Sequence, residues 1–189
     1  DPGTDYLWIV DPLDGTTNYI HGLPAYSVSI ALARHKEPVL GVVYEISRDE
    51  CFSAVKDNGA YLNGNKIQIS GRSELKDCLL ATGFPVRVFD QTGDYLNVIH
   101  DFFKESHGVR RFGSAAMDLA YVACGRFDGF FEYNLSPWDV AAGAVLVKEA
   151  GGTISDFKGG ENYIFGKEII AGNKAHGEML NVIQRHWVS

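Results

Sequence analysis

The sequence predicts an α/β fold made of two halves with different patterns. The chain has 189 residues, of which 46% are hydrophobic and 12% aromatic, enough to bury a sizeable core. Strand-like runs separated by turn signals dominate residues 1–107, whereas helical and strand patterns alternate across residues 108–189. We therefore predict an antiparallel-sheet half and a layered α/β half that together form one compact, two-lobed unit.

The first half carries runs rich in β-branched and aromatic residues, a composition typical of strands. These runs cover residues 6–10, 27–33, 39–46, 51–55 and 60–70. Asn58-Gly59 and Asn63-Gly64 tolerate the positive φ that tight hairpin turns require, and residues 35–38 have hairpin composition. This half should therefore be mostly antiparallel sheet.

Apolar residues at helical spacing become common later in the chain. A strand at 79–84, closed by Pro85, and a helix at 95–106 precede the boundary that we place near Gly108. Beyond it the patterns predict helices at 115–124, 137–150 and 176–185, and strands at 127–133 and 169–171. The aromatic residues Phe127, Phe130, Phe131 and Trp138 should lie in the core.

Charge and cysteine content narrow the functional classes. With 17 Lys plus Arg against 24 Asp plus Glu, the formal net charge is −7, so we expect no nucleic-acid partner. The negative charge of the protein would also repel an anionic small substrate, unless bound cations made the local electrostatic potential positive. Three cysteines without CxxC spacing suit the reducing cytosol and argue against disulfides or zinc. No apolar run approaches the ~20 residues of a membrane span, so we expect a cytoplasmic protein.

Residues 8–19, WIVDPLDGTTNY, place two carboxylates directly after the first predicted strand, which we take to be buried. Pro12 has no N–H for a sheet ladder, so the strand should end at Asp11. Gly15 allows a sharp turn whose N–H groups, with that of Thr16, can bind phosphate oxygens. Asp11 and Asp14 would repel such an anion unless a cation lay between them.

Oxygen ligands without Cys or His favour Mg²⁺, or Mn²⁺, over zinc. Taken alone, residues 14–17 are more typical of a turn, in which Asp14 closes an Asx-turn. A carboxylate at the end of a buried strand needs a partner, and Asp11 therefore favours a site over a plain turn.

A second candidate segment, SPWDVAAG, spans residues 136–143. Ser136 suits a helix N-cap and Pro137 the first helical position, which puts Asp139 at the third. There its carboxylate would interact favourably with the helix dipole and close a capping box. Spacing alone makes Asp139 a cap more often than a ligand, although a helix start can also direct a carboxylate into a cleft.

Two segments together, WIVDPLDGTTNYIHGLP and PWDVAAGAVLVKEAGG, resemble the signatures of the inositol monophosphatase family of Mg²⁺-dependent, lithium-sensitive phosphatases. NGAYLNGNKI, GSAAMDLAYVACGRFDGFFE and IIAGN resemble the family in order and spacing, so the similarity spans essentially all 189 residues. The resemblance implies a layered α-β-α-β-α sandwich, a homodimer and hydrolysis of a small phosphorylated polyol or sugar. It also implies two Mg²⁺ ions, or three, that activate water for attack on phosphorus.

The resemblance assigns roles in metal binding to four residues. Asp11 matches the ligand that bridges two metals, and the backbone carbonyl of Leu13 matches a ligand of the first metal. Asp14 and Asp139 match ligands of the second metal. Asp14 is then also a catalytic residue, and Asp139 also faces the substrate.

Other matching residues would contact the substrate. Gly15 and Thr16 match the phosphate-binding turn, and the catalytic Thr16 hydroxyl matches the group that orients the attacking water. Glu132 matches a residue that accepts hydrogen bonds from substrate hydroxyls, although its position alone is typical of a solvent-facing strand residue. Ser114 and Ala115 match a segment whose backbone faces the sugar, and Ser114 also suits a helix N-cap.

The family pattern includes a metal-binding glutamate upstream of the first strand. We expect this glutamate and its N-terminal helical layer to be missing from the sequence, which would weaken the first metal site and leave weak turnover or none.

Alternatives remain for the substrate and for catalysis itself. Within the same fold, the substrate could be fructose 1,6-bisphosphate, a 3′-phosphoadenosine nucleotide or NADP. A non-catalytic sugar-phosphate binding protein would keep the ligands without turnover. A phosphatase of the haloacid dehalogenase type is rejected, because its two aspartates lie at i and i+2 on one strand face, and here proline occupies residue 12.

Overall fold

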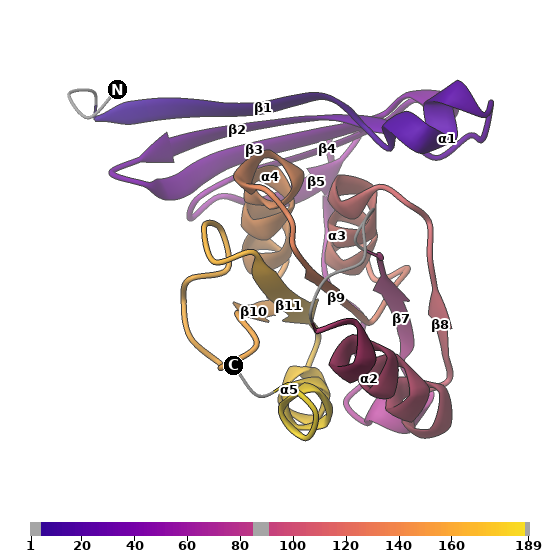
Figure 1. Cartoon of the computed structure of the whole chain (residues 1–189). Coiled ribbons are helices and arrows are strands. Elements are labelled where there is room, and N and C mark those ends of the chain that lie inside the picture. The colour runs from indigo at the N-terminus through magenta and orange to yellow at the C-terminus, as the bar shows by residue number, and fades with distance from the viewer. Residues whose placement is uncertain (1–4, 85–90, 188–189) are drawn as a thin grey trace.

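The computed structural model describes residues 5–84 and 91–187. In Figure 1 the elements stack into layers: a first sheet, a pair of helices, a second sheet and a second pair of helices. The layered α/β fold predicted from the sequence is confirmed. Pro85, expected to close a strand, lies outside the described residues.

The first sheet is antiparallel throughout, and its strands follow the order of the chain. The strands are β1 (Tyr6–Asp14), β2 (Ser27–Arg34), β3 (Glu37–Glu45), β4 (Glu50–Val55), β5 (Gly59–Leu62) and β6 (Asn65–Ile67). Asn63 and Gly64 adopt φ values of 48° and 79° between β5 and β6, as a tight turn requires. The antiparallel sheet predicted for the first half is therefore present.

The second sheet is mixed, because β7 pairs in parallel with β8 and β9 while the other pairs are antiparallel. Its spatial order is β10 (Thr153–Ser155), β11 (Glu168–Gly172), β9 (Gly129–Tyr133), β7 (Leu79–Thr82) and β8 (Gly108–Arg110). The chain therefore passes from the first sheet to the second between β6 and β7. Whether residues 1–107 and 108–189 are separate lobes stays a prediction.

Among the described residues, four helices complete the layers, and a fifth, short helix follows β1. Figure 1 shows α3 (Ala115–Ala123) and α4 (Pro137–Glu149) between the sheets, and α2 (Thr92–Glu105) and α5 (His176–Gln184) on the far face of the second sheet. The short helix is α1 (Thr16–Ile20), and single 3₁₀ turns cover Ile46–Arg48 and Leu75–Asp77.

Strand β9 separates two hydrophobic cores. Its side chains alternate, so Phe130 packs in the core with α3 and α4, whereas Phe131 packs in the core with α2 and α5. The core positions predicted for these residues and for Phe127 are confirmed. The same alternation returns Glu132 to the α3 and α4 side of the sheet.

Helix α4 packs unusually close to its neighbours because small residues meet there. A Cβ on Gly41 of β3 would lie 2.4 Å from the Ala142 carbonyl oxygen. A Cβ on Gly143 would lie 2.4 Å from the Leu119 Cβ of α3. These contacts fix the position of α4, and with it the residues at its N-terminus.

Strand β1 differs from its prediction in burial and in length. Tyr6 and Trp8 are 53% and 61% exposed, and only Ile9 of the predicted run is buried. The reason is that Tyr6 and Trp8 alternate with Ile9 and so point to the face of the sheet away from α3 and α4, which Figure 1 shows uncovered by other described elements. The strand also continues beyond Pro12 to Asp14, with a register shift between Asp11 and Asp14 in place of an end.

Other differences are local. Trp138 is 48% exposed, which overturns its predicted place in the core, because the second position of α4 faces a cavity. The short elements α1, β8 and β10 were not expected, since three to five residues carry too little periodicity to predict.

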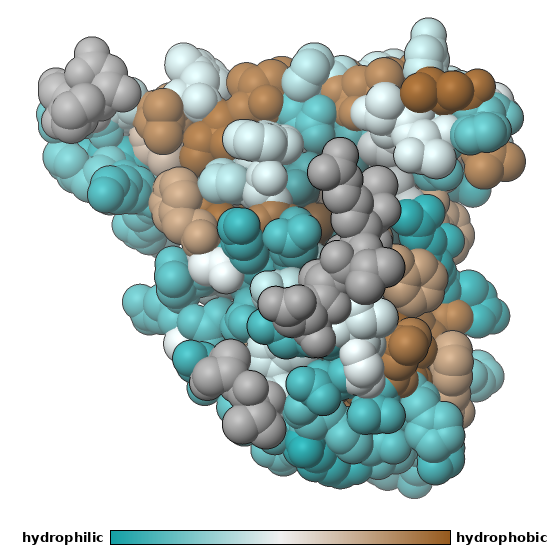
Figure 2. Space-filling model, viewed as in Figure 1, coloured by the Kyte–Doolittle hydropathy of each residue, from teal (hydrophilic) through white to brown (hydrophobic). Residues whose placement is uncertain are grey.

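Hydrophobic and hydrophilic surface residues gather over different layers of the fold. Figure 2 shows hydrophobic residues along the edge formed by β1 and α1, and hydrophilic residues around α2 and α5. The exposed hydrophobic residues of that edge include Leu7, Val10 and Ile20. Within the described ranges, none of the helices has the length and apolar character needed to cross a membrane.

Candidate active site

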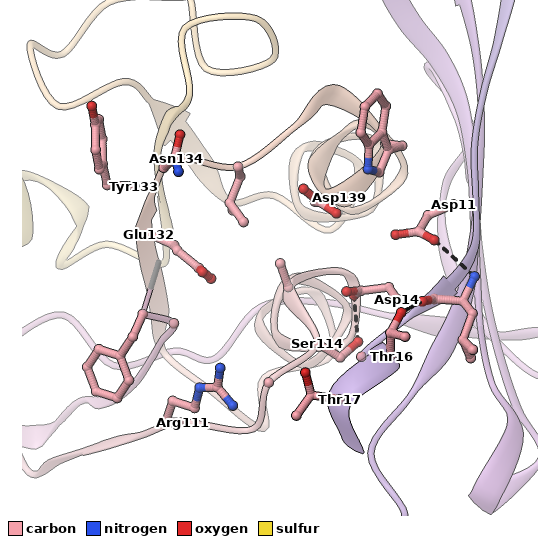
Figure 3. Close-up of a pocket in the computed structure, with 18 residues that line it drawn as sticks. Asp11, Asp14, Thr16, Thr17, Arg111, Ser114, Glu132, Tyr133, Asn134 and Asp139 are labelled. Carbon is pink, nitrogen blue, oxygen red and sulfur yellow. Dashed lines mark hydrogen bonds between the residues drawn. The ribbon is translucent and has the colours of Figure 1, made fainter. Parts of the chain in front are cut away.

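A cavity of about 560 Å³ opens where β1, α1, α3, α4 and β9 meet. In Figure 3 the end of β1 and the start of α1 form one wall, β9 forms the opposite wall, and the starts of α3 and α4 lie between them. All nine residues that the sequence assigns to the site line this cavity: Asp11, Leu13, Asp14, Gly15, Thr16, Ser114, Ala115, Glu132 and Asp139.

The end of β1 folds into a turn held by its own side chains. The Leu13 N–H donates to Asp11 Oδ1 at 2.9 Å, and the Thr16 hydroxyl donates to the Leu13 carbonyl at 2.9 Å. Gly15, at φ 87°, precedes α1, and a Cβ there would lie 2.7 Å from the Ala25 carbonyl oxygen. Only glycine fits this combination of positive φ and close contact.

Asp14 joins β1 to the start of α3. Its Oδ2 accepts hydrogen bonds from the Ser114 hydroxyl at 2.6 Å and from the Ala116 N–H at 2.8 Å. Ser114 is also the N-cap of α3 and accepts from the Met117 N–H at 3.4 Å. Both roles suggested for Ser114, cap and site residue, are therefore compatible with its position.

Asp139 occupies the first turn of α4 and serves as a helix cap. Its Oδ2 accepts a hydrogen bond from the Ser136 N–H at 2.7 Å, as in a capping box. The carboxylate also faces the cavity, where oxygens of Asp11, Asp14 and Asp139 all lie within 4.8 Å of one another. Three acids from distant parts of the chain thus form one cluster.

Burial, with a contribution from this crowding, raises the pKa of two members of the cluster. Burial raises the pKa of Asp14 to about 6, and the charges of Asp139 and Asp11 contribute to the rise. Burial, followed by the charge of Asp11, also raises the pKa of Asp139 to about 6. A divalent cation between these oxygens would offset the repulsion, and a donor set of oxygens alone suits Mg²⁺ or Mn²⁺.

Comparison with known proteins identifies the family. The sequence profile of the inositol monophosphatase family matches residues 2–187. The chain belongs to this family. Nus factor SuhB of Pseudomonas aeruginosa is 48% identical over 187 residues, which cover 97% of this chain and 69% of that protein.

Solved structures of inositol monophosphatases share the fold. The enzyme of Anabaena (Nostoc) sp. PCC 7120 superposes with a TM-score of 0.91 at 40% identity, covering 99% of this chain and 75% of that one. SaIMPase-II bound to inositol monophosphate superposes with a TM-score of 0.84 at 26% identity, covering 98% and 74%. The predicted family resemblance is confirmed.

In this inositol monophosphatase family member, Glu132 faces the acid cluster from the β9 wall of the cavity (Figure 3). It is 8% exposed, so the solvent-facing alternative does not apply. Burial, followed by the charge of Asp14, raises its pKa to about 8. Gly83 leaves room for it, because a Cβ there would lie 2.0 Å from Glu132 Oε1.

Two charged residues near the site were not predicted. Asp118 of α3 is 1% exposed, its Oδ1 has no hydrogen-bond partner, and burial raises its pKa well above the usual range. Arg111, the residue after β8, also lines the cavity. In the sequence, Asp118 stands out only as a lone acid in an apolar helix.

Proposed function

We propose that the protein is a Mg²⁺-dependent phosphate monoester hydrolase whose substrate is a phosphorylated polyol, most directly an inositol monophosphate. The observation that carries this proposal is the cluster of Asp11, Asp14 and Asp139, with oxygens within 4.8 Å of one another, beside the Gly15 turn. Family membership supports it, as does the relative crystallised with inositol monophosphate.

The acid cluster would hold the cations. Asp11, Asp14 and Asp139 supply carboxylate oxygens, and the Leu13 carbonyl, which already accepts from Thr16, retains a second lone pair. Bound Mg²⁺ supplies Lewis-acid stabilisation of phosphoryl charge and lowers the pKa of coordinated water. The hydrogen bonds from Ser114 and Ala116 keep the Asp14 carboxylate oriented before any ligand arrives.

The turn at the end of β1 would hold the phosphate. The N–H groups of Gly15 and Thr16 are the proposed donors to phosphate oxygens. Because the Thr16 hydroxyl donates its proton to Leu13, its oxygen is left to accept a hydrogen bond, which suits a group that orients the attacking water.

The opposite wall would bind the leaving alcohol. Glu132 is the proposed acceptor for substrate hydroxyls, and the start of α3 at Ser114 and Ala115 supplies backbone contacts. A homodimer and a cytoplasmic location remain predictions. That the protein binds no nucleic acid is also still a prediction. Because one relative is named a Nus factor, a mobility-shift assay with RNA is the experiment that tests it.

Phosphate release from purified protein tests the proposal. Myo-inositol 1-phosphate, fructose 1,6-bisphosphate and 3′-phosphoadenosine 5′-phosphate are compared with and without Mg²⁺. We expect release from the inositol or sugar phosphates that requires Mg²⁺ and stops with EDTA. Binding without release would favour the non-catalytic alternative, and release that ignores EDTA would contradict the proposal.

A further inference from the structure

Arg111 is the one basic side chain among the described residues that line the cavity. It directly follows β8. In Figure 3 its guanidinium and the Glu132 carboxylate both point into the cavity, on the side away from Asp11. A cation and the proposed acceptor for substrate hydroxyls therefore share one end of the cavity.

Uncharged contacts hold the guanidinium of Arg111 in place. Its Cζ lies 6.0 Å from the ring centroid of Phe84, a cation–π distance. Gly113 makes room for the guanidinium, because a Cβ there would lie 2.6 Å from Arg111 Nη1. Neither contact uses the N–H donors of the guanidinium.

Two acids interact electrostatically with Arg111. Burial and the charge of Asp14 raise the pKa of Glu132 to about 8, and the charge of Arg111 opposes that rise. Burial and the charges of Glu132 and Asp14 raise the pKa of Asp118 well above its usual range, again opposed by Arg111. Across residues 5–84 and 91–187, however, no carboxylate oxygen lies within 4.0 Å of a guanidinium nitrogen of Arg111. Arg111 is thus coupled to both acids without forming an ion pair with either.

Only one of these acids can meet a ligand. Asp118 is 1% exposed and is absent from the cavity wall, and its Oδ1 has no hydrogen-bond partner among the described residues. Its raised pKa keeps that carboxyl protonated and uncharged near neutral pH. Glu132, in contrast, lines the cavity. The guanidinium donors are therefore available to a group that lies between Arg111 and Glu132.

We propose that Arg111 is a specificity residue that donates a hydrogen bond to one substrate hydroxyl, the same hydroxyl that donates to Glu132. A hydroxyl oxygen carries one proton and two lone pairs, so it can accept from a guanidinium while it donates to a carboxylate. Two hydrogen bonds through one oxygen span roughly 4.5–5 Å, which fits a nitrogen–oxygen separation greater than 4.0 Å.

The charge of Arg111 adds to this role, because it favours the ionised form of Glu132, and a carboxylate is the stronger acceptor. The inference rests on the proposed phosphatase function and deepens it. It adds a side-chain donor to the acceptor Glu132, so that the β9 wall recognises a hydroxyl by both its proton and its oxygen.

Two cyclic phosphate esters test Arg111. Myo-inositol 1-phosphate and cyclohexyl phosphate share a six-membered ring, but only the first carries ring hydroxyls. Phosphate release in Mg²⁺ gives kcat/KM for the inositol ester, and cyclohexyl phosphate is measured by its Ki as a competitor. We expect R111Q to lower kcat/KM by about 10- to 100-fold, the range for a charge-assisted hydrogen bond, and to leave the Ki within about twofold.

Two further variants serve as controls. R110Q removes a neighbouring guanidinium that bonds only to the Val109 carbonyl among its described partners, and it should match the wild type with both esters. R111K keeps the charge but not the planar fork, and it should fall between the wild type and R111Q for the inositol ester alone. Circular dichroism verifies that each variant is folded.

A double-variant cycle tests whether Arg111 and Glu132 share one hydroxyl. If they do, the loss of kcat/KM in R111Q/E132Q should be smaller than the product of the two single losses by at least about threefold. The Ki of cyclohexyl phosphate should show no such coupling, because this ester has no hydroxyl to share. Single losses that simply multiply for the inositol ester would contradict the shared contact.

Two other results would overturn the inference. Equal weakening of both esters by R111Q would place Arg111 on the reacting phosphate or in a packing role. Unchanged kcat/KM for the inositol ester in R111Q would exclude contact, while the phosphatase proposal would stand. If the wild type releases no phosphate from the inositol ester and is not inhibited by cyclohexyl phosphate, the phosphatase proposal fails and this inference fails with it.

Discussion

Asp139 shows how one side chain can serve two roles. Its Oδ2 accepts the Ser136 N–H as a helix cap, while the carboxylate shares a cluster with Asp11 and Asp14. The two roles depend on different properties, because a cap needs only an acceptor oxygen, whereas a cation needs negative charge. A substitution that keeps the oxygen and removes the charge separates them.

We expect D139N to lower turnover by at least about 10²–10³-fold, the cost of losing one preorganised electrostatic contact at a reacting centre. Its free energy of unfolding should stay within about 1 kcal/mol of the wild type, because the amide oxygen can still accept from Ser136. Phosphate-release kinetics and urea denaturation measure the two effects.

The matched comparison is D139A, which removes the cap as well. It should lose the same turnover as D139N and, in addition, about 1 kcal/mol of stability. A D139N protein that turns over normally would leave Asp139 with its capping role alone.

The raised pKa of Glu132 should make the metal-free protein less stable as pH rises. Its pKa rises from 4.5 in the unfolded chain to about 8 in the folded one, so between these values the folded state retains a proton that the unfolded state releases. The free energy of unfolding should therefore fall as pH rises across this range, by at most on the order of 5 kcal/mol. Urea denaturation in EDTA at several pH values measures the slope.

The variant E132Q isolates that contribution, because glutamine does not titrate. It should flatten the pH dependence and exceed the wild type in stability at alkaline pH. E161Q, at an exposed surface position, is the control and should keep the wild-type slope. Identical slopes for E132Q and the wild type would mean that Glu132 is ionised in the folded protein.

At the scale of elements, the site depends on how closely α4 approaches β3. A Cβ added to Gly41 would lie 2.4 Å from the Ala142 carbonyl oxygen. Because both groups belong to backbones, either β3 or α4 would have to shift. We expect G41A to destabilise the protein by about 1–3 kcal/mol, as overpacking does. It should also lower Mg²⁺ affinity, because α4 carries Asp139.

The control for that prediction is G71A. Gly71 has no positive φ, and an added Cβ would meet no atom within 4 Å. Its stability should match the wild type in thermal and urea denaturation. Equal stability of G41A and G71A would mean that α4 can shift without cost.

Elements governed by local chemistry were predictable from the sequence. The Asn63-Gly64 turn and the Ser136 start of α4 follow from backbone preferences within a few residues. The exposure of Trp8 and Trp138 did not follow, because it depends on which surfaces other elements cover. The same holds for Arg111, whose place in the cavity is set by β8, an element too short to predict.

At the scale of the whole molecule, the candidate site joins segments far apart in the chain. The hydrogen bond from Ser114 to Asp14 spans 100 residues of sequence. The local pattern at the end of β1 already indicated a cation and phosphate site there, but its link to the starts of α3 and α4 came from family resemblance, since no local pattern relates these segments. Asp118 was missed because its burial next to Glu132 and Asp14 depends on the packing of α3, which its local sequence does not indicate.

Metal binding should stabilise the whole fold in a pH-dependent way. Protons compete with Mg²⁺ for Asp14 and Asp139, whose pKa values are about 6, so metal affinity should fall as pH drops below that value. We expect Mg²⁺ to raise the Tm clearly at pH 8 and only slightly at pH 5, by differential scanning fluorimetry. An equal rise at both values would argue against carboxylate ligands.

Anomalous diffraction from crystals grown with Mn²⁺ tests the central claim most directly. The account predicts strong anomalous peaks between the carboxylates of Asp11, Asp14 and Asp139, next to the Gly15 turn, and their loss in D14N crystals. A map with no peak at this cluster at saturating Mn²⁺, or with peaks only elsewhere on the protein, would contradict it.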